Sequence, residues 1–134
     1  MAQPSGTSPF DLTQYRWQNR LVLLFAPSPE DASYQQQTAV LEAEEAGLQD
    51  RDIVVFHLFS DTFSDTGHVD RQSLIQNEVE ALRKRFDIGE NTFTFVLIGK
   101  DGTVKRRSEE TVSVNDLFDQ IDAMPMRQRE MDAP

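Results

Sequence analysis

Three runs of apolar residues, each followed by proline, glycine or polar residues, stand out along the chain. They cover residues 20–26, 52–59 and 92–98, and the first two are apolar at nearly every position. Strands that are covered on both faces of a sheet have this pattern. We therefore predict three buried strands. A fourth is predicted over 103–107, where three basic residues suit the edge of a sheet.

The first helix is expected directly after the first strand. Ser28 or Asp31 can cap its N-terminus, and Pro29 suits its first turn. Gly47 is well placed to end the helix, because glycine adopts the left-handed conformation common at helix C-termini.

Two further helices follow from apolar residues at spacings of three and four. One covers residues 71–86, and the other covers residues 114–123 with Ser113 as its cap. A loop rich in Ser, Thr and Asp precedes the first of them, over 60–70. Lys100-Asp101-Gly102 predicts a tight hairpin between the last two strands.

The element order is therefore β-α-β-α-β-β-α, which predicts one three-layer α/β/α domain around a mixed, roughly four-stranded sheet. The thioredoxin-like fold is the best-known arrangement of this order. We place a flexible N-terminal lead over 1–9, the domain over 10–126, and a polar C-terminal tail over 127–134.

Composition narrows the function classes. The net charge of −10 argues against nucleic-acid binding, which needs a basic surface. No apolar stretch approaches the ~18 residues of a membrane span, and the N-terminus lacks the features of a signal peptide. The cytoplasm is the expected compartment, with a periplasmic or secreted mature form as the alternative. The oligomeric state is left open.

The chain contains no cysteine. This excludes disulfides, thiolate catalysis, zinc–cysteine sites and iron–sulfur ligation. No nucleotide-binding or zinc-protease motif is present either, so we predict no cofactor.

Six blocks of sequence together resemble a bacterial family known as domain of unknown function 4174. They lie at 15–20, 25–28, 34–37, 50–56, 97–102 and 124–131. The family's domain is similar to those of the vertebrate coiled-coil-domain-containing protein 80 and the sushi-repeat extracellular proteins. The resemblance implies a thioredoxin-like fold nearest the peroxiredoxins, but no activity.

In thioredoxins and peroxiredoxins the reactive cysteine follows the first core strand, where this chain has Pro27–Ser33. Thioredoxins also place a cis-proline before the third core strand, where this chain has Phe93-Thr94. We therefore predict a non-catalytic binding or scaffold module. The alternative is a thiol-independent enzyme that uses Ser, Asp or Glu side chains of the Pro27–Ser33 region, with Ser28 or Ser33 as candidate nucleophile and His57 as a further candidate. Helix capping is the favoured role for the serines.

Two weaker site hypotheses remain. Asp61, Asp65, His68 and Asp70 share one loop, but their spacing does not fit a known cation loop, and turns and caps explain them better.

The second hypothesis concerns four arginines that lie near aromatics and methionines, namely Arg16, Arg20, Arg127 and Arg129. Their guanidinium groups could bind a protein partner or a small anionic ligand. Ion pairs with the chain's own 23 acidic residues are the favoured alternative.

Overall fold

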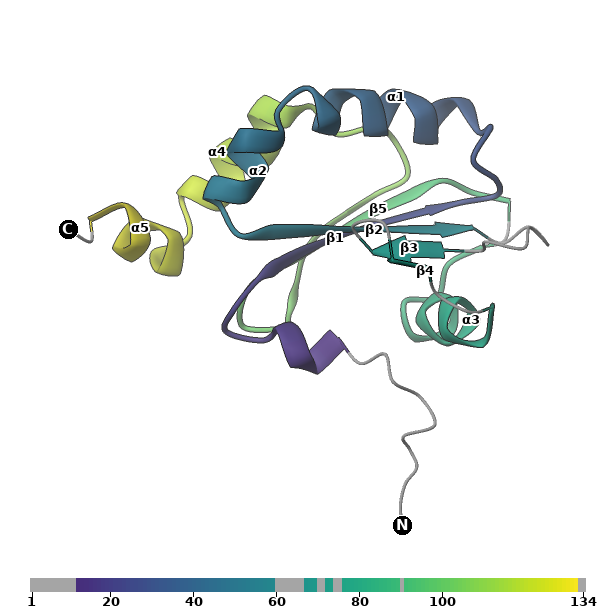
Figure 1. Cartoon of the computed structure of the whole chain (residues 1–134), viewed down its shortest axis with the longest axis horizontal. Helices are drawn as coiled ribbons and strands as arrows, with labels where there is room; N and C mark the ends of the chain where they lie inside the picture. Colours follow the sequence, from purple (N-terminus) through teal and green to yellow (C-terminus); the bar gives the residue numbers. More distant parts are fainter. Residues whose placement is uncertain (1–11, 60–66, 70–71, 74–75, 90, 133–134) are drawn as a thin grey trace, which may run out of the picture.

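A computed structural model describes residues 12–59, 67–69, 72–73, 76–89 and 91–132. Three layers are evident (Figure 1), with α1, α2 and α4 on one face of the sheet and η1 and α3 on the other. The elements run in the order η1 (Leu12–Tyr15), β1 (Arg20–Ala26), α1 (Ala32–Glu42), α2 (Glu45–Asp50), β2 (Ile53–Phe59), β3 (Gly67–Val69), β4 (Gln72–Ser73), α3 (Gln76–Arg85), β5 (Thr94–Ile98), β6 (Val104–Ser108), α4 (Val114–Asp122) and α5 (Pro125–Asp132).

The sheet has the strand order β4-β3-β2-β1-β5-β6. β1 pairs in parallel with β2, and all the other pairs are antiparallel. The predicted mixed sheet is thus confirmed, and its four longer strands are those expected from the sequence. The short strands β3 and β4 extend it beyond β2, in segments assigned to a loop and to a helix start. The basic strand β6 lies at the edge, as predicted.

Alternate residues of the central strands supply two separate cores. In β1, Val22 and Leu24 point to the face covered by α1, α2 and α4, whereas Leu21 and Leu23 point to the face covered by η1 and α3. All four side chains are buried. Helices on both faces therefore explain why the strands lack the polar positions of a half-exposed sheet.

The predicted first helix is divided into α1 and α2, and the prediction that Gly47 ends it is wrong. Gly47 lies inside α2, where a Cβ atom would stand 2.6 Å from the ring of Phe118. The glycine therefore permits close packing between α2 and α4. Asp31 caps α1 by accepting a hydrogen bond from the Tyr34 amide, and Ser113 caps α4 as predicted.

The tight hairpin after β5 is confirmed. Gly102 has a φ of +85°, a conformation that favours glycine. The carboxylate of Asp101 accepts hydrogen bonds from the amide and hydroxyl of Thr103 and from Lys105. The Lys105 ammonium and the Thr103 amide hold the pKa of Asp101 at about 2.

Residues assigned to a polar tail form most of a helix. α5 follows α4 after a short turn and extends from one end of the domain (Figure 1). Its Arg127 is buried, with 6% of the residue exposed. The physical reason is a set of ion pairs with earlier elements, described below.

Candidate functional site

The segment between β1 and α1 makes local hydrogen bonds to its own backbone. The Ser28 hydroxyl accepts a hydrogen bond from the Glu30 amide at 3.2 Å, and Asp31 accepts one from the Tyr34 amide at 3.0 Å. Ser33 lies in the first turn of α1. The N-cap of α1 is thus Asp31 and neither serine, and Ser28 instead stabilises the turn before the helix.

The side chain of His57 contacts the phenol of Tyr34. Its Nδ1 lies 2.9 Å from the Tyr34 hydroxyl in hydrogen-bonding contact, and the two rings meet edge-on. Burial and the nearby charge of Glu42 raise the pKa of Tyr34 to about 12, while a contact with Thr38 lowers it. The phenol therefore stays protonated at neutral pH. Tyr34, which lies in α1, thus orients the imidazole ring of His57. His57 lies on the same face of β2 as Val55.

The proposed metal ligands fall largely outside the described residues. This holds for Asp61, Asp65 and Asp70, whereas the backbone of His68 pairs with His57 between β2 and β3. Within the part of the chain that the structure describes, no group of three His, Cys, Asp or Glu residues is arranged to hold a metal ion.

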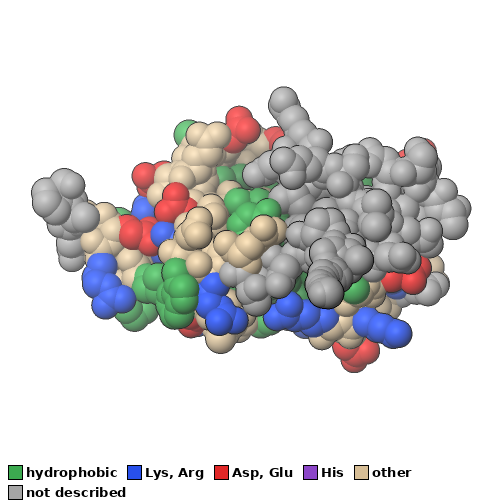
Figure 2. All heavy atoms as spheres, turned by 60° about the horizontal axis from the view of Figure 1, so that its bottom comes forward, with side chains coloured by type: hydrophobic (Ala, Val, Ile, Leu, Met, Phe, Trp, Pro, Cys, Tyr) green, Lys and Arg blue, Asp and Glu red, His purple; other side chains and the backbone are tan. Residues whose placement is uncertain are grey.

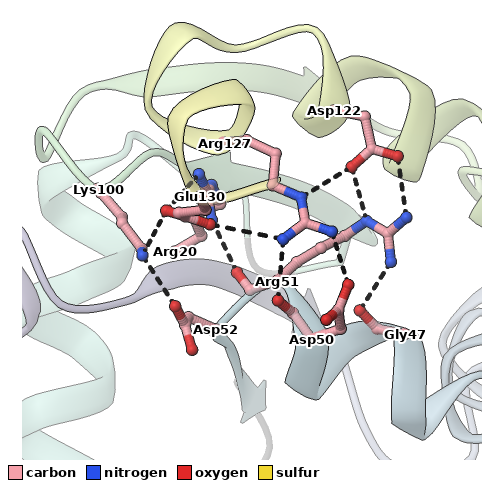
Figure 3. Close-up of polar contacts among 9 residues, drawn as sticks. All are labelled: Arg20, Gly47, Asp50, Arg51, Asp52, Lys100, Asp122, Arg127 and Glu130. Carbon is pink, nitrogen blue, oxygen red and sulfur yellow. Dashed lines mark hydrogen bonds and ion pairs between the residues drawn. The ribbon is translucent and has the colours of Figure 1, made fainter. Parts of the chain in front are cut away.

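Eight charged side chains form a network where α5 meets the rest of the domain (Figure 3). In its first half, Arg20 donates two hydrogen bonds of 3.2 Å to the carboxylate of Glu130. Lys100 donates to Glu130 at 2.6 Å and to Asp52 at 2.8 Å. Arg20 is only 1% exposed, so Glu130 balances a cation that water cannot reach.

The second half of the network holds α5 to α2 and α4. Arg127 donates to Asp122 at 3.0 Å and to Asp50 at 2.6 Å, and it lies 3.6 Å from Glu130. Arg51 donates two hydrogen bonds to Asp122, and its guanidinium group lies over the ring of Phe118. The four cations and four carboxylates are Arg20, Arg51, Lys100, Arg127, Asp50, Asp52, Asp122 and Glu130.

The network lowers the pKa of two of its carboxyl groups. Hydrogen bonds from Arg51, and secondarily from Arg127, outweigh burial and lower the pKa of Asp122. Burial alone would raise the pKa of Glu130, but hydrogen bonds from Lys100 and Arg20 reverse the direction.

We expect these shifts to make the protein sensitive to acid. A carboxyl group with a lowered folded-state pKa stabilises the fold fully above its unfolded pKa, about 4, and this stability is lost as the pH falls through the folded value. The melting temperature should therefore hold above about pH 5 and fall steadily below about pH 4. In Glu130→Gln the acid-dependent part of the fall should shrink. An identical pH profile in both proteins would contradict the assignment.

Of the four candidate arginines, the structure brings two together. Arg20 and Arg127 meet at Glu130 and are engaged within the chain. Arg16 is exposed and lies against the turn at Gly102, and Arg129 is exposed on α5. The network also uses cations and carboxylates that no sequence pattern singled out. Most of their partners lie 30 or more residues away along the chain, so local spacing carries little signal for them.

A groove opens beside β2, on the face covered by α1 and α2. Its volume is about 300 Å³. The floor is apolar and the rim is polar. The lining residues are Thr38, Leu41, Glu42, Glu45, Leu48, Gln49, Ile53, Val55 and His57. Sequence reasoning assigned the apolar members to the core and missed the opening, because a hydrophobic pattern does not show where helices leave a gap. We call this feature the β2 groove.

Trp17 is a second exposed feature. It is 62% exposed and has a φ of 70°, which is unusual for a bulky residue. Its amide donates to the Lys100 carbonyl at 2.6 Å, which ties the turn before β1 to the hairpin after β5. The arrangement leaves the indole ring at the surface.

No described helix is both long and apolar enough to cross a membrane. The compartment expected from the sequence stays a prediction.

Comparisons with known proteins agree with the fold and the resemblance. The profile of a family described as "Domain of unknown function (DUF4174)" matches residues 11–130. Coiled-coil domain-containing protein 80 of Danio rerio is 31% identical over 133 residues, which cover 90% of this chain and 15% of that protein. Sushi repeat-containing protein SRPX2 of Xenopus laevis is 29% identical over 120 residues, which cover 90% of this chain and 26% of that protein. The chain thus spans a small part of the length of these relatives.

Among solved structures, the chain is similar to reduced 2-Cys peroxiredoxin of Plasmodium vivax. The TM-score is 0.66 at 16% sequence identity, with coverage of 90% of this chain and 85% of that chain. Thioredoxin peroxidase I of Plasmodium yoelii matches with a TM-score of 0.64 at 18% identity, covering 92% and 82% of the two chains. The predicted thioredoxin-like fold is confirmed.

Proposed function

This chain belongs to the DUF4174 family, and from that premise we propose that it is a non-catalytic binding module on a thioredoxin-like fold. The observation that carries the proposal is the segment between β1 and α1. Its Ser28 hydroxyl stabilises the turn before α1 and its Asp31 carboxylate caps α1, at the place where relatives of this fold keep a thiolate. A serine hydroxyl does not replace a thiolate in peroxide reduction or disulfide exchange.

The charge of this segment also opposes a nucleophilic anion. Glu30 and Asp31 stand at the start of α1, where a reactive thiolate would need a positive environment. The β2 groove, on the sheet face that α1 and α2 cover, gives the domain a surface suited to binding.

We expect purified protein to show no peroxide consumption and no disulfide reduction above a heat-denatured sample. A cysteine-containing peroxiredoxin, assayed with the same reductant, is the positive control. Turnover well above the denatured sample would overturn the proposal.

A matched variant tests the alternative of a serine-dependent enzyme. Ser28→Ala should behave as the unmodified protein in a screen of ester and amide hydrolysis, because Ser28 serves a turn. A hydrolytic activity that is present in the original chain and lost in folded Ser28→Ala would support the enzyme instead.

A further inference from the structure

We propose that the β2 groove binds a basic segment of a protein partner, one that presents an apolar side chain next to lysine or arginine. This inference rests on the proposed binding function and names its site and the chemistry of its partner.

The floor of the groove is suited to an apolar anchor. Leu41 and Leu48 come from α1 and α2, and Ile53 and Val55 come from β2. Each is less than a tenth exposed, so most of its surface packs against the core and only a small part lines the groove. A volume of about 300 Å³ lies at the lower end of the ~300–1,000 Å³ typical of ligand sites. The space therefore fits an inserted side chain better than a large cofactor.

The rim of the groove selects for positive charge. Glu42 and Glu45 are exposed at its edge. Residues 30–50 contain six acidic residues and no lysine or arginine. Arg51, the next cation along the chain, is engaged with Asp122. A cationic segment would thus be attracted by the rim and by the net charge of −10, and an anionic one repelled.

The other polar groups at the rim offer hydrogen bonds to a bound segment. Thr38 and Gln49 flank the groove, and His57 lies at its end, oriented by Tyr34. An apolar centre within a polar border is the usual anatomy of a protein-binding site.

A second copy of this chain is the competing occupant, because the chain has basic side chains of its own. Figure 2 shows Lys and Arg side chains in a row along the lower border of one face, with hydrophobic side chains between them. The basic side chains of β6 are engaged within the chain: Lys105 with Asp101, Arg106 with Gln120, and Arg107 with backbone carbonyls after α3. Mutual repulsion of two chains of charge −10 also opposes self-association.

The experiment compares three labelled peptides of equal length by fluorescence anisotropy with the full chain. The first alternates leucine and arginine, the second has serine in place of leucine, and the third has glutamate in place of arginine. Only the first should bind appreciably, and its affinity should fall at least about fivefold between low and high salt, as expected for attraction between exposed charges.

Two variants locate the site. Gln49→Arg places a cation at the rim and should weaken binding of the leucine–arginine peptide about tenfold or more. Gln36→Arg makes the same change of charge at an exposed position of α1 that does not line the groove, and should retain binding. Circular dichroism of each variant confirms that the fold is intact.

Three results would overturn the inference: equal binding of the serine–arginine peptide, equal weakening by both variants, or self-association that Gln49→Arg abolishes. The last would assign the groove to a second copy. None of them would alter the outcome of the peroxide and disulfide assays, so a failure of this inference remains distinct from a failure of the proposed function.

Discussion

Replacement of Glu130 by alanine is expected to lower the free energy of unfolding by about 3 kcal/mol, because it takes the counter-charge from the buried Arg20. The Glu130 carboxylate accepts hydrogen bonds from both terminal nitrogens of Arg20 and from the ammonium of Lys100. Arg20 is 1% exposed, and its Nε already lacks a hydrogen-bond partner within the described part of the chain. For a domain of this size the melting temperature should fall by roughly 10 °C. Urea denaturation provides the free energy directly.

A matched control and a double variant test the cause. Glu109→Ala removes an equal charge from an exposed position, and its stability should change by less than about 0.5 kcal/mol. Arg20→Met combined with Glu130→Ala should cost clearly less than the sum of the single changes, because the buried charge leaves together with its partner. Strict additivity would show that the pair is not coupled.

Replacement of Gln37 by alanine should cost about 3–4 kcal/mol. Gln37 is fully buried in α1, and its amide is bonded at both ends to one residue: Nε2 donates to the Val112 carbonyl at 2.9 Å, and Oε1 accepts from the Val112 amide at 2.7 Å. The side chain thus acts as a strand-like partner for the backbone before α4. Its loss leaves two buried backbone groups unsatisfied and creates a cavity.

Gln37→Met separates these two effects, because methionine fills a similar volume without hydrogen bonds. We expect it to cost about 2–3 kcal/mol, so that most of the loss persists. Gln36→Ala, at the exposed neighbouring position, should cost less than about 0.5 kcal/mol. If Gln37→Met were as stable as the unmodified chain, the paired hydrogen bonds would not be the source of the stability.

These two sets of contacts have a common role. Gln37 joins α1 to the segment before α4, and Glu130 and Arg127 join α5 to β1 and α2. Both connect parts of the chain that strand pairing does not hold together. α5 is therefore an integral element of the domain, and the family match, which extends to residue 130, includes most of it.

Local patterns in the sequence predicted the fold well. Unbroken apolar runs indicated strands covered on both faces, and the two cores confirm this for Val22 and Leu23 in β1. The hairpin at Gly102 and the cap at Ser113 were found because each depends on a few adjacent residues. The same reasoning failed at Gly47, whose role is set by a ring on another helix.

The candidate site was harder to predict from the sequence than the fold. Arg20 was singled out, yet its partner Glu130 lies 110 residues away and no spacing connects the two. The β2 groove depends on how closely α1 and α2 approach β2, a distance that residue types along one segment do not specify.

By itself, the sequence determined that this is an α/β domain without thiol chemistry, because periodicity and residue type are local properties. Only the tertiary structure decided which charges are paired, that the polar C-terminal segment is a docked helix, and where the surface stays open. The reason is that ion pairs and grooves depend on the relative placement of elements that are far apart in sequence, and that placement is set by the packing of both cores together.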